Sequence, residues 1–178
     1  MQIWLDQVQE EPFNWDETQS VAPERLDRPE LLALGPVSWR GQVIFTDPGY
    51  FLRAKLSYEQ TLSCNRCLKP IVDSAGADVE LMIMTDEGPG GGGEHELRER
   101  DLGTFYMDGK VLDTDPILVE QLQLNIPMKP LCREDCKGIC PTCGADLNLG
   151  ACVCEEKTVD PRWASLAALK SRLGADQS

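Results

Sequence analysis

Two stretches in the first third of the chain alternate between apolar and polar residues. The segment Tyr50–Tyr58 is apolar at every second position, and the segment Val37–Ile44 alternates in part. A period of two is typical of strands with one buried face. The residues Asp47-Pro48-Gly49 form a turn signal between the two stretches. The pattern therefore predicts a β-hairpin.

The neighbouring segments extend this sheet. Residues 1–36 mix apolar anchors with acids and prolines, which predicts an opening strand, a loop and a short helical turn over residues 30–34. A further strand is expected near residues 78–84. The Cys-x-x-Cys at residues 64–67 then lies at a connection between strands. The simplest arrangement is an antiparallel sheet.

Two segments carry helix signals. In residues 113–126, Asp or Thr stands at the cap position, Pro116 lies in the first turn, and leucines recur along one side before Pro127 ends the helix. Residues 160–173 open with Asp-Pro and carry an apolar stripe. The fold class is predicted to be α+β, with an antiparallel sheet, a few helices and a cysteine-rich, zinc-binding C-terminal segment.

Composition divides the chain further. The glycine run in residues 87–94 is too poor in apolar groups to pack and predicts a flexible loop near residues 87–100. The lone histidine, His95, is read as a solvated residue of that loop. We expect an α+β core over residues 1–130, a metal-binding segment over residues 131–157, and a helix with a tail over residues 158–178.

Charge limits the class of partner. The 178 residues carry a formal net charge of -13, which argues against a general nucleic-acid coat protein because such proteins neutralise phosphates with Lys and Arg. A local basic patch or a basic protein partner is compatible with this charge. The N-terminus is acidic and no run of about eighteen apolar residues occurs, so we expect a cytoplasmic protein without membrane contact.

Cysteine is the residue type with the clearest chemistry. In a reducing compartment, eight cysteines at metal-ligand spacings favour metal binding over disulfides, and zinc takes two pairs per tetrahedral site. The most compact site uses Cys140, Cys143, Cys152 and Cys154, which leaves Cys132 and Cys136 to share a second ion with Cys64 and Cys67 or to stay free. Because Cys152 and Cys154 are closely spaced, Cys132 or Cys136 is an alternative to one of them. The four pairs are Cys64 with Cys67, Cys132 with Cys136, Cys140 with Cys143, and Cys152 with Cys154.

Other chemistries use the same residues. An iron-sulfur cluster is the main rival to zinc. A thiol-redox role for Cys64 and Cys67 and a zinc-finger type nucleic-acid-binding regulator are further alternatives, although no basic recognition helix follows the cysteines. A nucleotide-binding glycine loop is absent, and hydrolytic zinc chemistry lacks a well-placed histidine. The sequence therefore predicts a non-enzymatic protein without a small-molecule substrate.

Three segments together resemble the YceD family, described as large ribosomal RNA subunit accumulation proteins. They are CNRCLKP at residues 64–70, LNIPMKPLC at residues 124–132, and CREDCKGICPTCGADLN from residue 132, followed by the last cysteine pair and DPRWASLAALK. The resemblance spans roughly residues 37–173. It implies a bacterial or organellar protein needed for normal accumulation or processing of 23S ribosomal RNA, with no enzymatic activity established.

The resemblance also suggests partners. They are ribosomal RNA, or a ribosomal or assembly protein, and the acidity of this chain favours the protein because ribosomal proteins are commonly basic. If RNA is contacted directly, the expected cations lie mostly near the cysteines: Arg66, Lys69, Lys129, Arg133, Lys137 and Arg162. Some family members lack much of the C-terminal cysteine cluster, so the metal is expected to stabilise this segment while function lies on the sheet and the final helix.

Overall fold

The computed structural model describes residues 1–85 and 103–154. The chain divides into two compact units, Met1–Cys136 and Lys137–Ser178. The predicted glycine loop, His95, the predicted helix at residues 160–173 and Arg162 lie outside the described residues. The cysteine-rich segment contributes its first pair to the first unit and its remaining four cysteines to the second.

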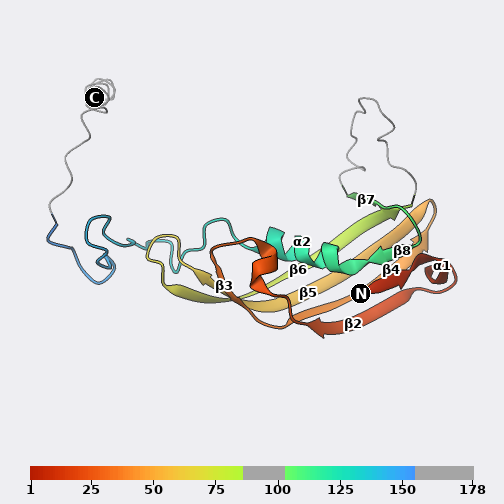
Figure 1. The fold of residues 1–178 in the computed structure, drawn as a ribbon, viewed down its shortest axis with the longest axis horizontal. Helices are drawn as coiled ribbons and strands as arrows, with labels where there is room; N and C mark the ends of the chain where they lie inside the picture. Colours follow the sequence, from red (N-terminus) through yellow and green to blue (C-terminus); the bar gives the residue numbers. More distant parts are fainter. Residues whose placement is uncertain (86–102, 155–178) are drawn as a thin grey trace, which may run out of the picture. The chain divides into compact units, whose positions relative to one another are not determined.

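A six-stranded sheet forms the framework of the described part of the first unit (Figure 1). Its order is β2-β4-β5-β6-β7, and β3 pairs with the far end of β5; all pairs are antiparallel except β6 with β7. A two-stranded sheet pairs β1 with β8. The strands are β1 (Gln2–Trp4), β2 (Phe13–Gln19), β3 (Leu31–Leu34), β4 (Val37–Thr46), β5 (Gly49–Ser63), β6 (Pro70–Met84), β7 (Thr104–Tyr106) and β8 (Val111–Asp113).

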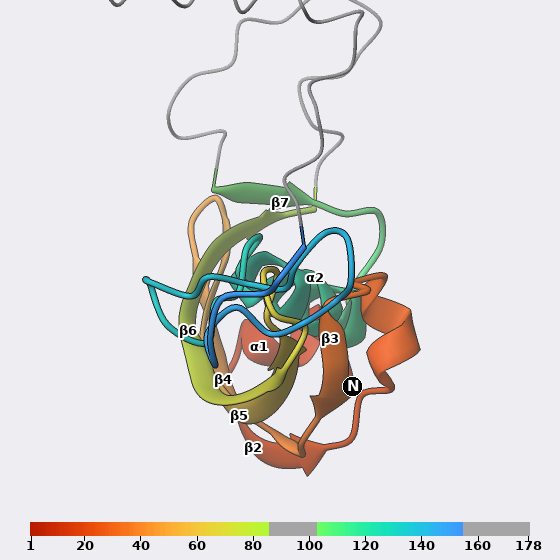
Figure 2. The same cartoon turned by 90° about the vertical axis from the view of Figure 1, so that its left-hand side faces the viewer.

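The predicted hairpin is formed by β4 and β5. Thr46 pairs with Gly49 across a tight connection in which the Asp47-Pro48 peptide bond is cis. Alternate side chains of β5 are buried, as the sequence pattern predicted. The sheet curves around the helix α2 (Figure 2), so one face is covered by the core and the other is open.

Helix α2 (Thr114–Asn125) supplies the cover. The Asp113 carboxylate accepts a hydrogen bond from the Asp115 amide, which satisfies a free N–H of the first turn and confirms the predicted cap. Ile117, Leu118 and Leu122 are buried, and each such side chain contributes about 1.5–3 kcal/mol by burial. Helix α1 (Leu5–Val8) and the short helix η1 (Pro23–Leu26) complete this layer. Within the described ranges, no helix is long and apolar enough to cross a membrane.

Two local predictions are wrong. Residues 31–34 form strand β3 instead of a helical turn. The Gly35 amide donates to the Glu59 carbonyl of β5, and the Glu30 carbonyl accepts from the Ser63 amide of β5. A single helical turn cannot compete with this strand pairing. The helical turn lies earlier, at Pro23–Leu26. Strand β6 also begins at Pro70 and not near residue 78, since its first half, which contains the small residues Ser74–Ala77, is held by pairing with β5.

Candidate metal centre

Two Cys-x-x-Cys segments adopt the same backbone fold. In the first, the Cys64 amide donates to the Lys69 carbonyl at 2.9 Å and the Leu68 amide donates to the Cys64 carbonyl at 2.9 Å. In the second, the Cys140 amide donates to Ala145 at 2.8 Å and the Gly144 amide donates to Cys140 at 2.9 Å. Each segment is therefore a closed knuckle that turns both sulfurs toward one side.

The residue after the second cysteine allows this closure. Leu68 has a φ of 61° and Gly144 a φ of 75°, both in the left-handed region. Glycine adopts this conformation without steric cost, whereas a residue with a Cβ pays about 1–2 kcal/mol. Closing the first knuckle with a leucine therefore adds strain that the second avoids.

The first knuckle, between β5 and β6, meets the chain that follows α2. The Asn65 amide donates to the Pro130 carbonyl at 2.9 Å, and the Cys132 amide points at the Cys64 sulfur at 3.4 Å. These contacts bring Cys64, Cys67, Cys132 and Cys136 together, with all sulfurs within 4.8 Å of one another. The Cys64 to Cys136 sulfur distance is 3.9 Å and the Cys67 to Cys132 distance is 3.6 Å. We call these residues the first tetrad.

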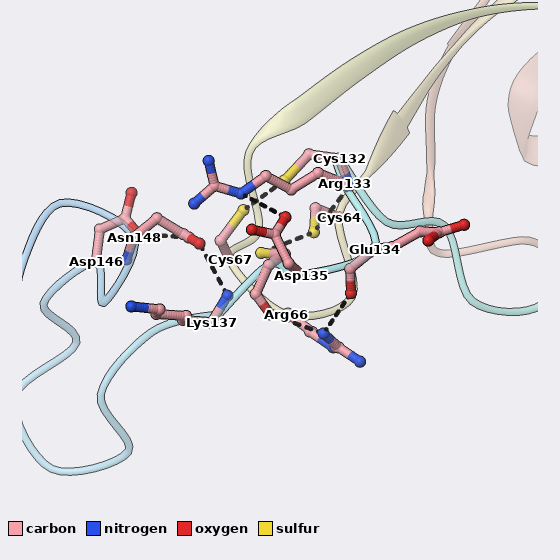
Figure 3. A network of polar contacts seen from close by, with 11 residues as sticks. Cys64, Arg66, Cys67, Cys132, Arg133, Glu134, Asp135, Lys137, Asp146 and Asn148 are labelled. Carbon is pink, nitrogen blue, oxygen red and sulfur yellow. Dashed lines mark hydrogen bonds and ion pairs between the residues drawn. The ribbon is translucent and has the colours of Figure 1, made fainter.

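Arg66 connects the two chain segments that carry the cysteines of the first tetrad. Its guanidinium donates from Nη1 to the Glu134 carbonyl at 3.0 Å and to the Cys136 carbonyl at 2.8 Å (Figure 3). The side chain starts in one knuckle and ends on the backbone that carries the opposite pair of sulfurs. Arg66, predicted as an RNA or partner contact, thus has a structural role in the site.

The second tetrad, Cys140, Cys143, Cys152 and Cys154, lies in the second unit. The Cys152 and Cys140 sulfurs are 3.3 Å apart. The Asn148 side chain accepts from the Lys137 amide at 2.8 Å, and Asp146 accepts from the Asn148 amide at 2.9 Å, so polar contacts order the intervening loop. Of the partitions considered, the structure has the compact one, in which each tetrad takes two pairs.

The sulfur spacing fits a single tetrahedral ion. With metal-sulfur bonds of about 2.3 Å, tetrahedral geometry places sulfurs about 3.8 Å apart, and the measured 3.3–3.9 Å distances lie close to this value. A polynuclear iron-sulfur cluster binds its cysteines to separate iron atoms and needs wider spacing. Each tetrad could therefore hold one metal ion.

In each tetrad, hydrogen bonds to one cysteine sulfur lower the pKa of that thiol and favour the thiolate. Burial raises the pKa of the Cys64 thiol, but backbone N–H groups of Cys67, Cys132 and Arg66 outweigh burial and lower the pKa to about 6. Hydrogen bonds from the amides of Cys143 and Thr142 lower the pKa of Cys140 to about 6.

The opposing thiols favour the protonated form in the absence of a cation. Burial and the neighbouring sulfurs raise the pKa of Cys132 to about 12. The contact with Cys143, followed by burial, raises the pKa of Cys154 to about 12. Neither tetrad therefore holds four thiolates by itself, and a divalent cation would favour loss of the remaining thiol protons.

The two tetrads differ in protection from solvent. Cys64, Cys67 and Cys136 are buried in the first, whereas only Cys140 is buried in the second. The exposed Cys132 is the accessible member of the first tetrad.

The other predicted contact residues are distributed unevenly. Lys69, Lys129 and Arg133 are exposed in the first unit near the first tetrad, and Arg133 pairs with Asp135 at 3.3 Å. Lys137 is exposed in the second unit, and Arg162 is not among the described residues. The structure therefore places four of the six predicted cations, namely these three and Arg66, near the first tetrad.

Cations on the open face of the sheet were missed from sequence. Strand register brings Arg40, Arg53 and Lys55 together beside a shallow depression of about 480 Å³. Arg53 pairs with Glu80 at 2.9 Å and Lys55 with Asp78 at 3.5 Å. The alternation of β4 and β5 already placed these residues on the polar face, but their mutual contact depends on a register that the sequence does not specify.

The part of the chain that contains both tetrads matches a known protein family. The sequence profile described as "Large ribosomal RNA subunit accumulation protein YceD" matches residues 52–170, a range that contains all eight cysteines. An uncharacterised protein of Mycobacterium tuberculosis is 32% identical over 107 residues, covering 60% of this chain and 48% of the relative. The chain thus spans about half the length of the mycobacterial relatives it matches.

Two further relatives differ in coverage. The Zea mays chloroplastic "Large ribosomal RNA subunit accumulation protein YCED homolog 1" is 27% identical over 130 residues, covering 56% of this chain and 42% of that protein. The uncharacterised protein YlbN of Bacillus subtilis is 24% identical over 169 residues, covering 93% and 92%. No solved structure gives a significant match. Because the family profile matches well over half of the chain, this protein belongs to the YceD family.

Proposed function

We propose that this protein is a non-enzymatic factor that supports the accumulation or processing of 23S ribosomal RNA and the assembly of the large ribosomal subunit in the cytoplasm. The observation that carries the proposal is the family match over residues 52–170, together with plant relatives named for large ribosomal RNA subunit accumulation. The matched range includes most of strand β5, all of β6 and both tetrads.

The direct partner is a ribosomal or assembly protein. A net charge of -13 attracts basic proteins and repels phosphates, which supports this choice over naked RNA. Lys69, Lys129 and Arg133 remain the cations through which RNA would be touched near the first tetrad.

Zinc is the ion we propose for both tetrads. Four thiolates at close tetrahedral spacing are the ligand set of closed structural zinc sites. The first tetrad would hold the chain after α2 against the turn between β5 and β6. The second would fold a loop that has few buried apolar side chains of its own.

Depletion of the protein from its own cell tests the function. The ratio of 23S to 16S ribosomal RNA should fall selectively, 23S precursor ends should accumulate, and the wild-type chain should restore both. A chain with the first tetrad changed to serine should restore them only in part, since the sheet keeps its core. An unchanged ratio with unchanged precursor ends contradicts the proposal.

Elemental analysis of the purified chain tests the metal. We expect two zinc ions per chain, one for each tetrad, and no visible absorption. Coloured protein that contains iron would favour the iron-sulfur alternative. Rapid alkylation of Cys64 and Cys67 in the metal-loaded chain would favour the thiol-redox alternative, because zinc-bound sulfurs react slowly until a chelator is added.

A further inference from the structure

Strand β6 leaves a long backbone edge open. It pairs with β5 along one side from Pro70 to Ile83, but β7 covers its other side only at Met82–Met84. From Pro70 to Leu81, no strand among the described residues pairs with that second side. At about 3.3 Å per residue, this free edge is about 40 Å long. A row of unpaired N–H and C=O groups of this length is a template for another strand.

The side chains along this edge have one charge sign. Strand β6 carries Asp73, Asp78 and Glu80 and no lysine or arginine. Asp78 and Glu80 lie on the open face of the sheet and Asp73 on the opposite face, because side chains alternate along a strand. Between them, Ser74–Ala77 is a run of small residues that lets a second backbone approach closely.

Asp73 accepts a hydrogen bond from the buried Gln60, whereas the two acids on the open face have only weak partners. The pairs of Asp78 with Lys55 and of Glu80 with Arg53 are mostly exposed, and exposed ion pairs contribute little. A carboxylate also has acceptor positions for a second cation. These acids can therefore attract an incoming basic strand without breaking the sheet.

One other occupant and one other edge fit less well. A second copy of this chain that paired through the same β6 edge would bring acids against acids, and like charges on neighbouring strands are destabilising. The other open edge with acidic residues, β2, runs only from Phe13 to Gln19. The β6 edge, from Pro70 to Leu81, is longer.

We infer that the edge of β6 from Pro70 to Leu81 binds an extended, lysine- or arginine-rich segment of a protein partner, which adds a strand to the sheet. Main-chain hydrogen bonds supply the attachment, and the acids select basic side chains at alternate positions. The inference deepens the proposed function, on which it rests for the identity of the partner as an assembly or ribosomal protein. It concerns an interaction surface separate from the tetrads.

A synthetic strand tests the inference on the full metal-loaded chain. The probe is a ten-residue peptide in which lysine alternates with valine or threonine. Its binding should slow hydrogen exchange at alternate amides between Ile71 and Leu81, because only every second N–H faces outward. A peptide with the same lysines and proline at every other position keeps the charge but cannot pair as a strand, and should bind about tenfold more weakly or worse.

Variants separate the edge from the general negative charge. Neutralising the two β6 acids on the open face (Asp78→Asn and Glu80→Gln) should weaken binding about tenfold, by loss of favourable cross-strand charge pairs. The matched control is Asp16→Asn with Glu17→Gln on the edge of β2, which should leave binding unchanged. Of Ser74→Pro and Ala75→Pro, one removes an outward N–H; that variant should keep its melting temperature and lose the peptide.

Several results would overturn the inference. They are equal binding of the proline peptide, protection on β2 instead of β6, continued binding to the folded proline variant, and protection of β6 by single-stranded RNA but not by the peptide. Failure here is distinct from failure of the proposed function. If the peptide does not bind while depletion still lowers 23S RNA selectively, the assembly role stands and this docking surface is wrong.

Discussion

Loss of the Arg66 guanidinium is expected to weaken metal binding in the first tetrad. Arg66→Met keeps the length of the aliphatic stem and removes both hydrogen bonds to the carbonyls of Glu134 and Cys136. The hydrogen bond to Glu134 is exposed and the one to Cys136 is partly buried, so water replaces part of what is lost. Two bonds at about 0.5–1 kcal/mol each give about 1–2 kcal/mol, or about a 5- to 30-fold weaker affinity.

A competition assay measures this effect. The metal-loaded chain is titrated with a chromophoric chelator, and the two tetrads should release their ions in separate phases. In Arg66→Met only the phase of the first tetrad should shift, and Arg66→Lys should lie between this variant and the wild type because the shorter ammonium reaches the carbonyls less well. Arg53→Met is the matched control, since its ion pair with Glu80 lies on the open sheet face.

Release of both ions from Arg66→Met as from the wild type would refute a stabilising role of Arg66 in the first tetrad. An equal shift in Arg53→Met would also refute it, because the effect would then reflect net charge. If Arg66 serves mainly as a phosphate contact, its replacement will weaken RNA crosslinking and leave metal release unchanged.

Three further substitutions test the backbone and the core. Gly144→Ala should weaken metal binding at the second site by about 1–2 kcal/mol, because its φ of +75° is unfavourable for alanine. The added Cβ would meet nothing within 4 Å, so the effect comes from backbone conformation alone. Gly150→Ala, which is equally unobstructed and has an ordinary φ, is the control and should be neutral in the same chelator titration. Leu68→Gly should stabilise the first knuckle by about 0.5–1 kcal/mol, since relief of left-handed strain exceeds the entropy cost of glycine, and a higher chelator midpoint for that site would verify it. Gly41→Ala should destabilise the sheet by about 1–3 kcal/mol in chemical denaturation, because its Cβ would lie 2.5 Å from the Trp15 ring and 2.7 Å from the Ala54 Cβ. Trp15→Leu in the same chain should remove only the part of that cost that comes from the ring, and fully additive effects of the two changes would contradict the clash with Trp15.

Local chemistry in the sequence determined several parts of the structure. The alternation before and after Asp47-Pro48-Gly49 was enough for the β4–β5 hairpin, and the Asp113 cap with Pro116 was enough for α2. The Cys-x-x-Cys knuckles were also evident, since a few adjacent residues close them. In each case the deciding interactions join residues that are close in the chain.

Only the tertiary structure decided how the cysteines are shared. The first tetrad joins sulfurs about seventy residues apart, and this meeting depends on how α2 delivers the following chain to the turn between β5 and β6. The same is true of Arg66, whose partners Glu134 and Cys136 lie across that contact. The spacing of neighbouring residues in the sequence does not reveal these long-range contacts.

Strand pairing similarly overrode local preference at residues 31–34 and in the first half of β6. The sequence Leu31–Leu34 suits a helical turn, and Asp73–Ala77 has little strand character, yet both are held by backbone hydrogen bonds to β5. The sequence by itself thus determined the knuckles, the hairpin and the capped helix. Tertiary structure decided the tetrads, the extent of β6 and its open edge, because these depend on partners distant in the chain that fix backbone groups regardless of local propensity.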